Sequence, residues 1–515
     1  MFSGSATTPA RPVFDASTRT GKNSNGTGGR CFNDLTSKGK ITTLNLTRLL
    51  LRFMIGWAAV AGDLSQFYNT CKLVPTQWNL QRILWKPKLD PASAPEEAVI
   101  VTLIYGQISA SCQSECVMQK LAEDFTTLYP GVNDLLTKSR YVDDMADSKP
   151  DVVECAKLRV DADEVLGKVG VKCKAWTVSG RRPDEKISKD GVTIGVGGFR
   201  WDPVQDKMQV KVPNLYFAKK TRGRIADNTT FFDPDVHKMD EFVPRDLNLR
   251  LVTSKYGAIF DYLGFLSPAL ARTKLLLRRT VKETQGWDDV MSVELRSKWV
   301  KEFIFIEKLR GLNFHRAKMP KDAVNCEMRV LCGGDAAKEI FILGAWGGFK
   351  RQNGEWSCQL LVGKSLLCAD SWTILMAELV ALMGSANLSW TLNLALSEWL
   401  DPSRIVNFSD SNIALCWATS EGKKMGTFHR NRAIQIRRAV NLCNLYHVKT
   451  RFQPCDLGTR PEKVEVEDIG PDSQWFNGLP WMRLEIEEAV DTGILTPVSK
   501  SDCQTRRKLI IGEAC

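Results

Sequence analysis

The sequence predicts an α/β (α+β) protein with several domains. Apolar strand-like runs alternate with helical segments in two regions, and a Pro- and charge-rich stretch, residues 231–248, lies between them. The chain has 515 residues, enough for about three to five domains. With 43% hydrophobic and 25% charged residues the composition is ordinarily globular, which excludes a disordered, collagen-like or coiled-coil protein.

The first region follows a polar start. Residues 1–40 are dense in Ser, Thr, Asn and Gly, which predicts a loop around one short ordered stretch. An apolar-periodic helix is expected over residues 44–53, and a buried strand that ends in a carboxylate over residues 57–64. A long amphipathic helix is expected over residues 108–128, and a short strand–turn–strand over residues 141–146.

The second region follows the stretch 231–248, which has the composition of a linker. Helices are expected over residues 255–282 and 293–309. Residues 330–417 predict strands, one long helix at 370–396 and a further strand. No internal repeat is visible in the sequence.

Cysteine usage, charge and hydropathy narrow the class of protein. The 15 Cys include no CxxC pair, which disfavours a zinc site and makes buried free thiols the expectation. No signal peptide opens the sequence, and the most apolar run, residues 53–62, is too short to span a bilayer. We therefore expect a soluble intracellular protein without a membrane partner. The net charge of +11 is compatible with a polyanionic partner.

The first chemically sharp feature is YVDD, residues 141–144. Two adjacent carboxylates, Asp143 and Asp144, repel each other on a tight turn unless a cation neutralises them. Asp63 ends the apolar strand 80 residues upstream and offers a third carboxylate. Three such groups suit hard divalent ions, and a pair of these ions promotes phosphoryl transfer. The alternative for a bare Asp-Asp pair is a solvated turn.

A second acidic set follows downstream. Asp335 closes a predicted strand beside Gly333 and Gly334, where we expect a tight turn, and Glu378 lies on the long helix. Asp410 ends a strand where a helix begins, and Asp456 follows in QPCDLGTR. Spaced 43, 32 and 46 residues apart, these four residues could converge on a two-metal nuclease site. The alternative for Asp410 is an N-cap of the following helix.

An ordered series of motifs resembles the reverse transcriptase of Bel/Pao-type retrotransposons. The motifs are RPVFDAS (residues 11–17), GDLSQFY (62–68), YGQISAS (105–111), YVDD (141–144), VKCKAW (171–176) and IGVGGFRWDP (194–203). IFDYLGFLSP (259–268) with the following KLLLRR resembles the connecting block of the same family. The resemblance implies a reverse-transcriptase palm with truncated fingers, a helical connection and a ribonuclease H-like domain with a mixed sheet.

The resemblance also implies roles for single residues. Asp63, Asp143 and Asp144 match the three metal-binding palm carboxylates. Tyr68 matches the aromatic residue beneath the incoming sugar, where a ring would clash with a 2′-hydroxyl and favour deoxynucleotides. Arg11, in the fingers remnant, matches a basic residue that would meet the triphosphate. An ordinary surface arginine remains the alternative for Arg11.

Tyr141 opens YVDD and completes the nucleotide site that the resemblance implies. The sequence also departs from the family at Gln107 and Ser111, where the family usually has an apolar residue and a Pro. Only ten residues precede Arg11, so most of the fingers is expected to be missing. These departures affect nucleotide positioning and leave the carboxylates intact.

In the same order, Asp335, Glu378, Asp410 and Asp456 resemble the acidic set of ribonuclease H. SDSNIAL (residues 409–415) and the stretch 447–461 fit the family well, whereas GGDAAKE departs from it after the first Asp. Four arginines on one expected helix could bind the phosphates of a hybrid, with a solvated face as the alternative. They are Arg430, Arg432, Arg437 and Arg438.

Two other activities are not supported. VDTGIL (residues 490–495) has the form of an aspartic protease signature, but only 22 residues follow Gly493, so a turn after a helix at 485–490 is expected. No His-His-Cys-Cys pattern of an integrase module occurs in the sequence.

Together these observations predict an RNA-directed DNA polymerase of a retrotransposon with an associated ribonuclease H-like nuclease. The implied cofactor is Mg²⁺, two ions per site, with Mn²⁺ as an alternative. The implied partners are an RNA template, a DNA primer, an RNA–DNA hybrid and deoxynucleoside triphosphates, within a larger Pol polyprotein and in a cytoplasmic particle or the nucleus. The alternatives are a degenerate copy that only binds nucleic acid, a non-catalytic binding or structural protein with the same architecture, and a nuclease without polymerase activity.

The predicted segments follow from these motifs. They are a flexible start with a fingers remnant (1–43), the palm (44–205), a thumb or connection (206–325), the ribonuclease H-like domain (326–465) and a C-terminal boundary segment (466–515).

Overall fold

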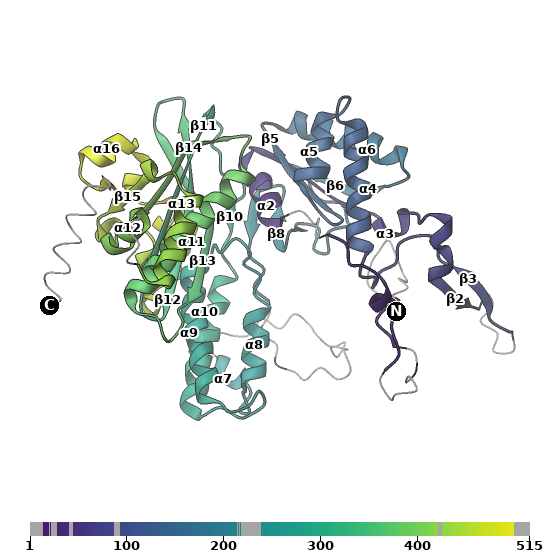
Figure 1. Cartoon of the computed structure of the whole chain (residues 1–515), viewed down its shortest axis with the longest axis horizontal. Coiled ribbons are helices and arrows are strands. Elements are labelled where there is room, and N and C mark those ends of the chain that lie inside the picture. Colours follow the sequence, from purple (N-terminus) through teal and green to yellow (C-terminus); the bar gives the residue numbers. More distant parts are fainter. Residues whose placement is uncertain are drawn as a thin grey trace. The chain divides into compact units, whose positions relative to one another are not determined.

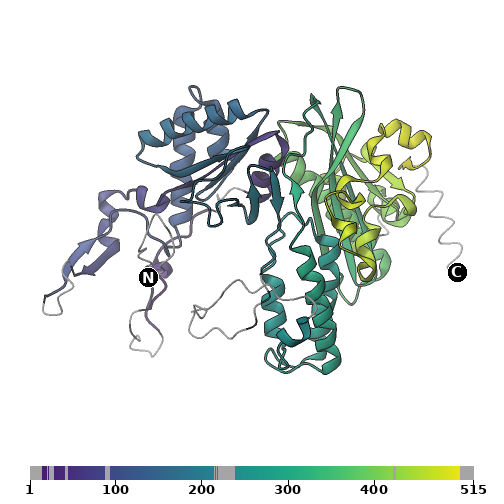
Figure 2. The same cartoon turned by 180° about the vertical axis from the view of Figure 1, so that it is seen from behind.

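The computed structural model divides the chain into two compact units. The residues that the structure describes are 14–19, 21, 28–40, 45–86, 93–213, 215, 217, 238–420 and 425–498, without the side chains of 325 and 326. One unit holds residues 1–197 and 202–206, and the other holds residues 198–201 and 207–515. Purple-to-blue elements belong to the first unit and teal-to-yellow elements to the second (Figures 1 and 2). The bounds of the five predicted segments stay predictions.

An antiparallel sheet in the order β4-β5-β1-β6 forms the centre of the first unit. Its strands are β1 (Ala58–Leu64), β4 (Arg140–Tyr141), β5 (Asp144–Lys149) and β6 (Cys173–Val178). The helices that pack on this sheet or on each other are α2 (Leu46–Ile55), α4 (Ala110–Phe125), α5 (Pro130–Lys138) and α6 (Val152–Lys168). Buried apolar side chains from both layers, such as Val60, Met145 and Leu166, form its core. The predicted helix at 44–53, strand at 57–64 and helix at 108–128 correspond to α2, β1 and α4.

Shorter elements surround this sheet. They are α1 (Phe32–Leu35), α3 (Phe67–Thr70), the 3-10 helix η1 (Pro75–Gln81), β2 (Arg82–Trp85), β3 (Glu96–Val99) and β7 (Ile194–Val196). Strands β2 and β3 pair antiparallel in a ribbon of their own.

A mixed sheet in the order β13-β12-β11-β14-β15-β16 organises the second unit. Its strands are β11 (Ala323–Ala336), β12 (Ile340–Arg351), β13 (Trp356–Leu367), β14 (Leu400–Ser409), β15 (Leu445–Val448) and β16 (Leu495–Pro497). Strand β14 runs parallel to both β11 and β15, and the other neighbouring pairs are antiparallel. The mixed sheet that the resemblance implied is therefore present.

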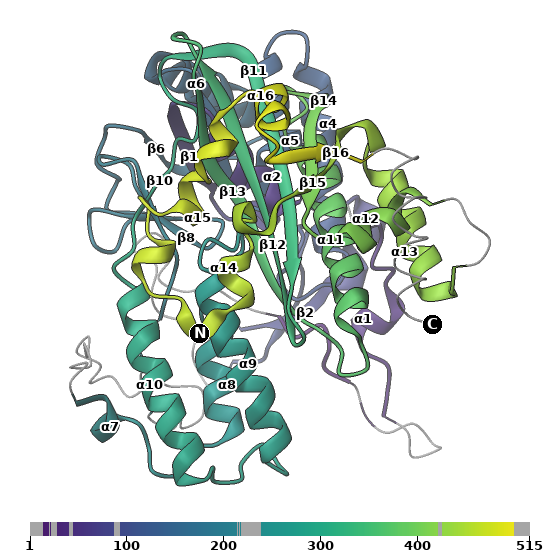
Figure 3. The same ribbon diagram turned by 90° about the vertical axis from the view of Figure 1, so that its left-hand side faces the viewer.

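Helices cover both faces of the mixed sheet (Figure 3). One layer consists of α11 (Ile374–Ala395), α12 (Asn412–Thr419) and α13 (Thr427–Ala439). The other face carries α14 (Asp456–Thr459), α15 (Gln474–Asn477) and the 3-10 helix η7 (Pro480–Arg483). Helix α16 (Ile486–Asp491) precedes β16.

Helix α11 is long and apolar enough to cross a membrane by length and composition. Half of its most apolar window is buried, and the helix packs against β11, β12 and β14. It is therefore the core helix of this sheet.

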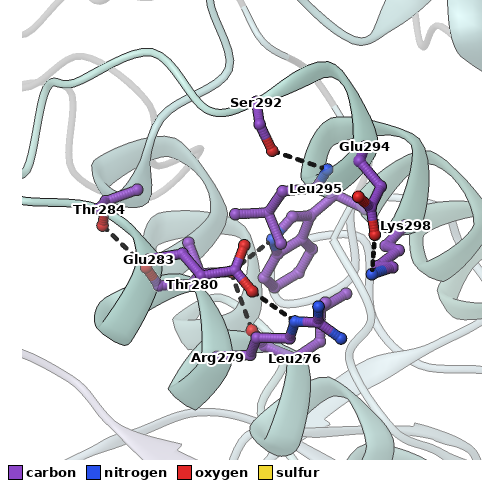
Figure 4. Close-up of polar contacts among 10 residues, drawn as sticks. Leu276, Arg279, Thr280, Glu283, Thr284, Ser292, Glu294, Leu295 and Lys298 are labelled. Atoms are coloured by element: carbon purple, nitrogen blue, oxygen red, sulfur yellow. Dashed lines mark hydrogen bonds and ion pairs between the residues drawn. The ribbon is translucent and has the colours of Figure 1, made fainter.

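A helical region precedes the mixed sheet. It contains α7 (Met239–Phe242), α8 (Leu249–Gly257), α9 (Ser267–Glu283) and α10 (Val293–Leu309), with the short strands β8 (Phe199–Asp202), β9 (Lys207–Gln209) and β10 (Phe314–His315). The Ser292 side chain caps α10 by accepting a hydrogen bond from the Leu295 amide (Figure 4). The indole of the buried Trp299 donates to the Thr280 hydroxyl at 2.8 Å and joins α10 to α9.

The predicted single helix over residues 255–282 is wrong, because a turn separates α8 from α9. The carboxylate of Asp261 accepts hydrogen bonds from the amides of Phe265 at 2.9 Å and Leu266 at 2.8 Å. Gly264 adopts a φ of +71°, which is outside the helical region. Pro268 then lies at the start of α9, where its missing N–H costs no helical hydrogen bond.

The expected tight turn at Gly333 and Gly334 is also wrong, because both residues lie inside β11. A Cβ at Gly333 would lie 2.2 Å from the Phe408 ring, and a Cβ at Gly334 would lie 2.8 Å from the Ala381 carbonyl oxygen of α11. These glycines therefore allow β14 and α11 to approach β11 closely.

Smaller predictions are confirmed. Gly493 takes a φ of +66° in a turn after α16, as expected for VDTGIL. All cysteines among the described side chains are free thiols, and most are buried as expected, but Cys116 and Cys443 are exposed. Of the stretch 231–248, residues 231–237 lie outside the described residues, and α7 occupies part of the remainder.

Candidate active sites

The first acidic site lies where β1 meets β5. Asp63 is paired with Asp144 in the antiparallel register, and Asp143 occupies the preceding turn. The Leu64 amide donates a hydrogen bond to the Asp143 carbonyl oxygen at 2.9 Å. The strand pairing therefore brings the three predicted palm residues together although 80 residues separate the first two in the sequence.

The YVDD turn is strained and held by a buried ion pair. Val142 has a φ of +57°, a conformation that a β-branched residue rarely adopts. Arg140 donates to the Val142 carbonyl oxygen at 2.7 Å. The same guanidinium forms a bidentate pair with Glu115 of α4 at 2.9 and 2.7 Å, and both side chains are buried. Sequence analysis did not identify this pair, because only the fold brings α4 under the turn.

Lys174 is a basic neighbour of Asp63 and Asp144. Lys174 of β6 forms an ion pair with Asp63 Oδ2 at 2.6 Å. The other oxygen of Asp63, Oδ1, is buried and has no hydrogen-bond partner in the described part of the chain. Burial, with the charges of Asp143 and Asp63, raises the pKa of Asp144 to about 7, and Lys174 opposes this rise. The site has excess negative charge and could accept a cation.

A cavity of about 590 Å³ adjoins the carboxylates within this unit. Asp63, Asp144 and Lys174 line it together with the loop 185–189. That loop contributes Lys186 and Lys189, whose positive charges suit a phosphate-bearing ligand. Sequence analysis quoted VKCKAW, which contains Lys174, only as a family motif and gave this lysine no role. It did not identify either loop lysine as a site residue.

The predicted nucleotide-binding residues have different positions. The half-buried Tyr68 packs against Tyr105 with the ring centroids 5.0 Å apart and the ring planes tilted by 44°. Burial raises the pKa of the Tyr68 phenol, although Ser111 hydrogen-bonds to it. Tyr141 is 38% exposed in β4 opposite Asp144. Arg11 lies outside the described residues. Ser111, which stands where the family usually has a Pro, therefore supplies a polar partner to Tyr68.

The second acidic site lies in the second unit and consists of Asp335, Glu378 and Asp410. Each offers a carboxylate oxygen, and these atoms lie within 4.8 Å of one another. Asp335 is near the end of β11, and Asp410 directly follows β14. Because β11 and β14 are parallel with Gly333 opposite Phe408, both carboxylates come to the same end of the sheet.

Helix α11 supplies the third carboxylate from its first turns. Thr373 caps this helix by accepting a hydrogen bond from the Met376 amide at 3.3 Å. The glycine at 334 lets the helix backbone approach β11 and so brings Glu378 to the strand ends. Thr373 thus sets where α11 begins, and Gly334 sets how closely α11 approaches β11.

The charges of the second site make it suited to a divalent cation. Burial and the charge of Asp410 raise the pKa of Asp335 to about 7. Burial, with Asp335 and Asp410 nearby, raises the pKa of Glu378 to about 9. Glu378 Oε2 is buried and lacks a hydrogen-bond partner in the described region. A hard ion such as Mg²⁺ would neutralise this repulsion, so the residues fit such an ion.

Asp456, the fourth predicted residue, is near the trio but outside it. It begins α14, and its charge contributes to the raised pKa of Asp335. Its Oδ1 forms an ion pair with Arg460 at 2.9 Å. In its place the α14 region contributes the Thr459 hydroxyl, which donates to Asp335 Oδ2 at 2.8 Å. Upstream of α14, Gln453 Nε2 lies 3.4 Å from Asp410 Oδ1.

The N-cap alternative for Asp410 is wrong. Ser411 caps α12, and its side chain accepts a hydrogen bond from the Ala414 amide. The Asp410 carboxylate therefore remains directed to the acidic trio.

The predicted arginine face is only partly available. Arg437 donates to the carbonyl oxygens of Ala418 and Ser420, and Arg432 donates to Phe428 and covers its ring at 3.4 Å. Arg430 and Arg438 are exposed. Two of the four arginines thus stabilise the helix layer, and two face solvent.

Comparisons with known proteins agree with this geometry. Residues 248–411 match the family model of the Pao retrotransposon-like RNaseH-like domain. No curated protein gives a match. A solved structure of the foamy viral protease-reverse transcriptase dRH in complex with double-stranded DNA is similar with a TM-score of 0.51 and 14% identity, over 83% of this chain and 64% of that chain.

A second solved structure, the foamy viral protease-reverse transcriptase in complex with an RNA/DNA hybrid, has a TM-score of 0.47 and 13% identity over 79% of this chain and 46% of that chain. This chain thus spans 64% of the length of the first structure. At such identities the likeness to the first structure shows a shared fold.

Proposed function

We propose that the chain, in which residues 248–411 match the family model of the Pao retrotransposon-like RNaseH-like domain, hydrolyses the RNA strand of an RNA–DNA hybrid. The observation that carries this proposal is the trio of Asp335, Glu378 and Asp410, of which the first is buried and the other two partly buried, with carboxylate oxygens within 4.8 Å of one another. Divalent ions held there would supply positive charge beside the scissile phosphate and lower the pKa of the attacking water.

The chain's own residues would hold and orient the carboxylates. Asp335 and Asp410 lie at the ends of two parallel strands, so their backbones are rigid. The Thr459 hydroxyl fixes one oxygen of Asp335, and Gln453 does the same for Asp410. The exposed Arg430 and Arg438 would contact phosphates of the hybrid and add affinity without sequence preference.

Hybrid cleavage with Mg²⁺ tests this proposal. Asp410→Asn should lower the cleavage rate about 100-fold or more, because it removes a charged ligand from the trio. Asp401→Asn is the matched control, since Asp401 is an exposed residue of the same strand, and it should cleave like the unaltered chain. Equal rates in both variants, or cleavage that persists in excess EDTA, would refute the assignment.

A second candidate activity is RNA-directed DNA synthesis in the first unit. It is favoured by the pairing of Asp63 with Asp144 and by the adjoining 590 Å³ cavity lined by Lys174. Asp63, Asp143 and Asp144 would hold two Mg²⁺ ions, with Mn²⁺ as an alternative. The primer 3′-hydroxyl would then attack the α-phosphorus of a deoxynucleoside triphosphate and displace pyrophosphate, with Tyr68 beneath the sugar.

Lys174 competes with a metal ion for Asp63 in this second activity. Its ion pair with Asp63 occupies an oxygen that a metal would need, so Lys174 would have to turn towards the triphosphate in the working state. Lys174→Met should therefore raise the nucleotide concentration for half-maximal extension.

Primer extension on an RNA template tests the polymerase assignment. Asp143→Asn should abolish incorporation, and Asp124→Asn, a change in an exposed residue of α4, should not. Template binding without extension or cleavage in the unaltered chain would favour the alternative of a protein that only binds nucleic acid. Hybrid cleavage without primer extension would favour the alternative of a nuclease without polymerase activity.

A further inference from the structure

An unsatisfied amide lies inside the mixed sheet of the second unit. Asn407 is in β14 and has an exposed fraction of 0%. Neither its Oδ1 nor its Nδ2 has a hydrogen-bond partner within the described residues. Burying such a group without a partner is unfavourable, and an occupant that bonds to both atoms would remove that penalty.

The amide lines a cavity of about 260 Å³ between α11, β14 and the end of α13, which adjoin one another (Figure 3). The lining residues are Ser389, Trp390, Asn393, Pro402, Ile405, Asn407, Arg438, Ala439, Val440 and Asn441. One water takes up about 30 Å³ in the liquid, so the cavity has room for more than the single water that a buried amide often holds. Ser389 lies 11 residues after Glu378 on α11, roughly 16 Å along the helix, so this cavity is separate from the acidic trio.

The lining indicates what would fit. A carboxamide presents a donor beside an acceptor, the pattern that pairs with the edge of a nucleobase. Trp390 is 51% exposed and offers an aromatic face for a planar ring. Arg438 is exposed at the same cavity and could bind a phosphate attached to that base.

We infer that this cavity is a nucleotide-binding pocket in which the Asn407 amide recognises the base and Arg438 the phosphate. The occupant is a single nucleotide unit, either free or as part of a single strand next to the bound hybrid. The pocket goes beyond the proposed cleavage: no residue of the acidic trio lines it, and only Arg438 is shared with the proposed contacts to the hybrid.

The test measures binding to the full chain in excess EDTA, so that metal at the acidic trio plays no part. The probes are the four nucleoside 5′-monophosphates, a single-stranded oligonucleotide of about ten residues and inorganic phosphate alone. The variants are Asn407→Leu, Arg438→Gln and, as a control, Asn387→Leu. Asn387 is an exposed residue of the same helix α11 and does not line the cavity.

At least one base should bind the unaltered chain and the Asn387→Leu control equally. Asn407→Leu should weaken that binding about tenfold or more, because it removes a bidentate contact to the base. Arg438→Gln should weaken nucleotide binding and abolish any binding of inorganic phosphate. Binding of monophosphates points to a free nucleotide, and binding of the oligonucleotide alone points to a base within a strand.

The thermal stability of Asn407→Leu separates a ligand pocket from a structural role. Without ligand, this variant should unfold at the same temperature as the unaltered chain or higher, since replacing an unsatisfied buried amide by an apolar group of similar shape removes its desolvation penalty. A clear loss of stability, or equal responses of Asn407→Leu and the unaltered chain to every probe, would overturn the inference and leave a cavity that holds only water.

Discussion

At the scale of single residues, the acidic trio of the second unit links stability to pH. The folded-state pKa of Asp335 is raised to about 7 from 3.8, and that of Glu378 to about 9 from 4.5. A raised pKa means that the metal-free fold binds protons more tightly than the unfolded chain. The stability that these groups contribute is therefore complete below about pH 4 and is lost as the pH rises through about 7 to 9.

We therefore expect the unfolding temperature in EDTA to fall between pH 6 and pH 9 by more in the unaltered chain than in Glu378→Gln. The glutamine variant keeps a neutral side chain at the site, so it should be the more stable protein at pH 9. Each kcal/mol of difference corresponds to about 2–4 °C for a domain of this size. Mg²⁺ should stabilise the unaltered chain more than the variant. Parallel pH curves for the two proteins would contradict the raised pKa values.

The buried pair of Arg140 and Glu115 gives a second prediction at this scale. Arg140→Met leaves Glu115 as an uncompensated buried charge beneath the YVDD turn, which should cost about 3–5 kcal/mol of unfolding free energy. The double variant Arg140→Met/Glu115→Leu should recover most of that loss, because the remaining side chains are apolar. Denaturant unfolding of both variants measures this difference. A double variant as unstable as the single one would show that the bond to the Val142 carbonyl dominates.

At the scale of elements, Gly334 sets the distance between β11 and α11. Gly334→Ala would place a Cβ about 2.8 Å from the backbone oxygen of Ala381, so the helix that carries Glu378 must shift. We expect a loss of about 1–3 kcal/mol in stability and weaker Mg²⁺ binding at the trio. Gly257→Ala is the control, since a Cβ there meets nothing within 4 Å and alanine favours the helix. Calorimetry and Mg²⁺ titration of the two variants check this.

The same elements show how far sequence reasoning reaches. Strand β1 with Asp63, the YVDD turn, and the helix with Glu378 were predictable because periodicity and motif order are local properties. The close approach at Gly333 and Gly334 could not be predicted. A glycine pair in a sequence indicates a turn unless the residues that pack against it are known. Lys174 was missed for a similar reason: its partner Asp63 is 111 residues away.

Asp261 illustrates the remaining error at the element scale. Periodicity alone predicted one helix over residues 255–282, because an apolar pattern continues through the turn. The carboxylate of Asp261 instead bonds to the amides of Phe265 and Leu266 and competes with helical hydrogen bonding. To predict this turn from sequence, one would have to judge that the hydrogen bonds of the Asp261 side chain outweigh an apolar periodicity that continues through it.

At the scale of the whole molecule, the two acidic sites belong to different compact units. Each set of carboxylates is completed within its own unit, by β1 and β5 in one and by β11, α11 and β14 in the other. The proposed activities should therefore be separable by mutation. Asp143→Asn should leave hybrid cleavage within about twofold of the unaltered chain, and Asp410→Asn should leave primer extension equally unaffected. A coupled loss in either variant would show that one site depends on the other.

The charge of the whole chain determines how it should hold nucleic acid. The net charge of +11 is compatible with binding through phosphate contacts, which release counterions and carry no sequence information. For each two phosphates neutralised, the affinity for a hybrid should fall about tenfold between 50 and 200 mM salt. Hybrids of unrelated sequence should show the same slope of log affinity against log salt concentration. Arg430→Gln should reduce the magnitude of that slope by about one. Fluorescence anisotropy with a labelled hybrid in EDTA measures the slope without cleavage. An affinity that does not change with salt would mean that apolar or base contacts, and not phosphates, hold the nucleic acid.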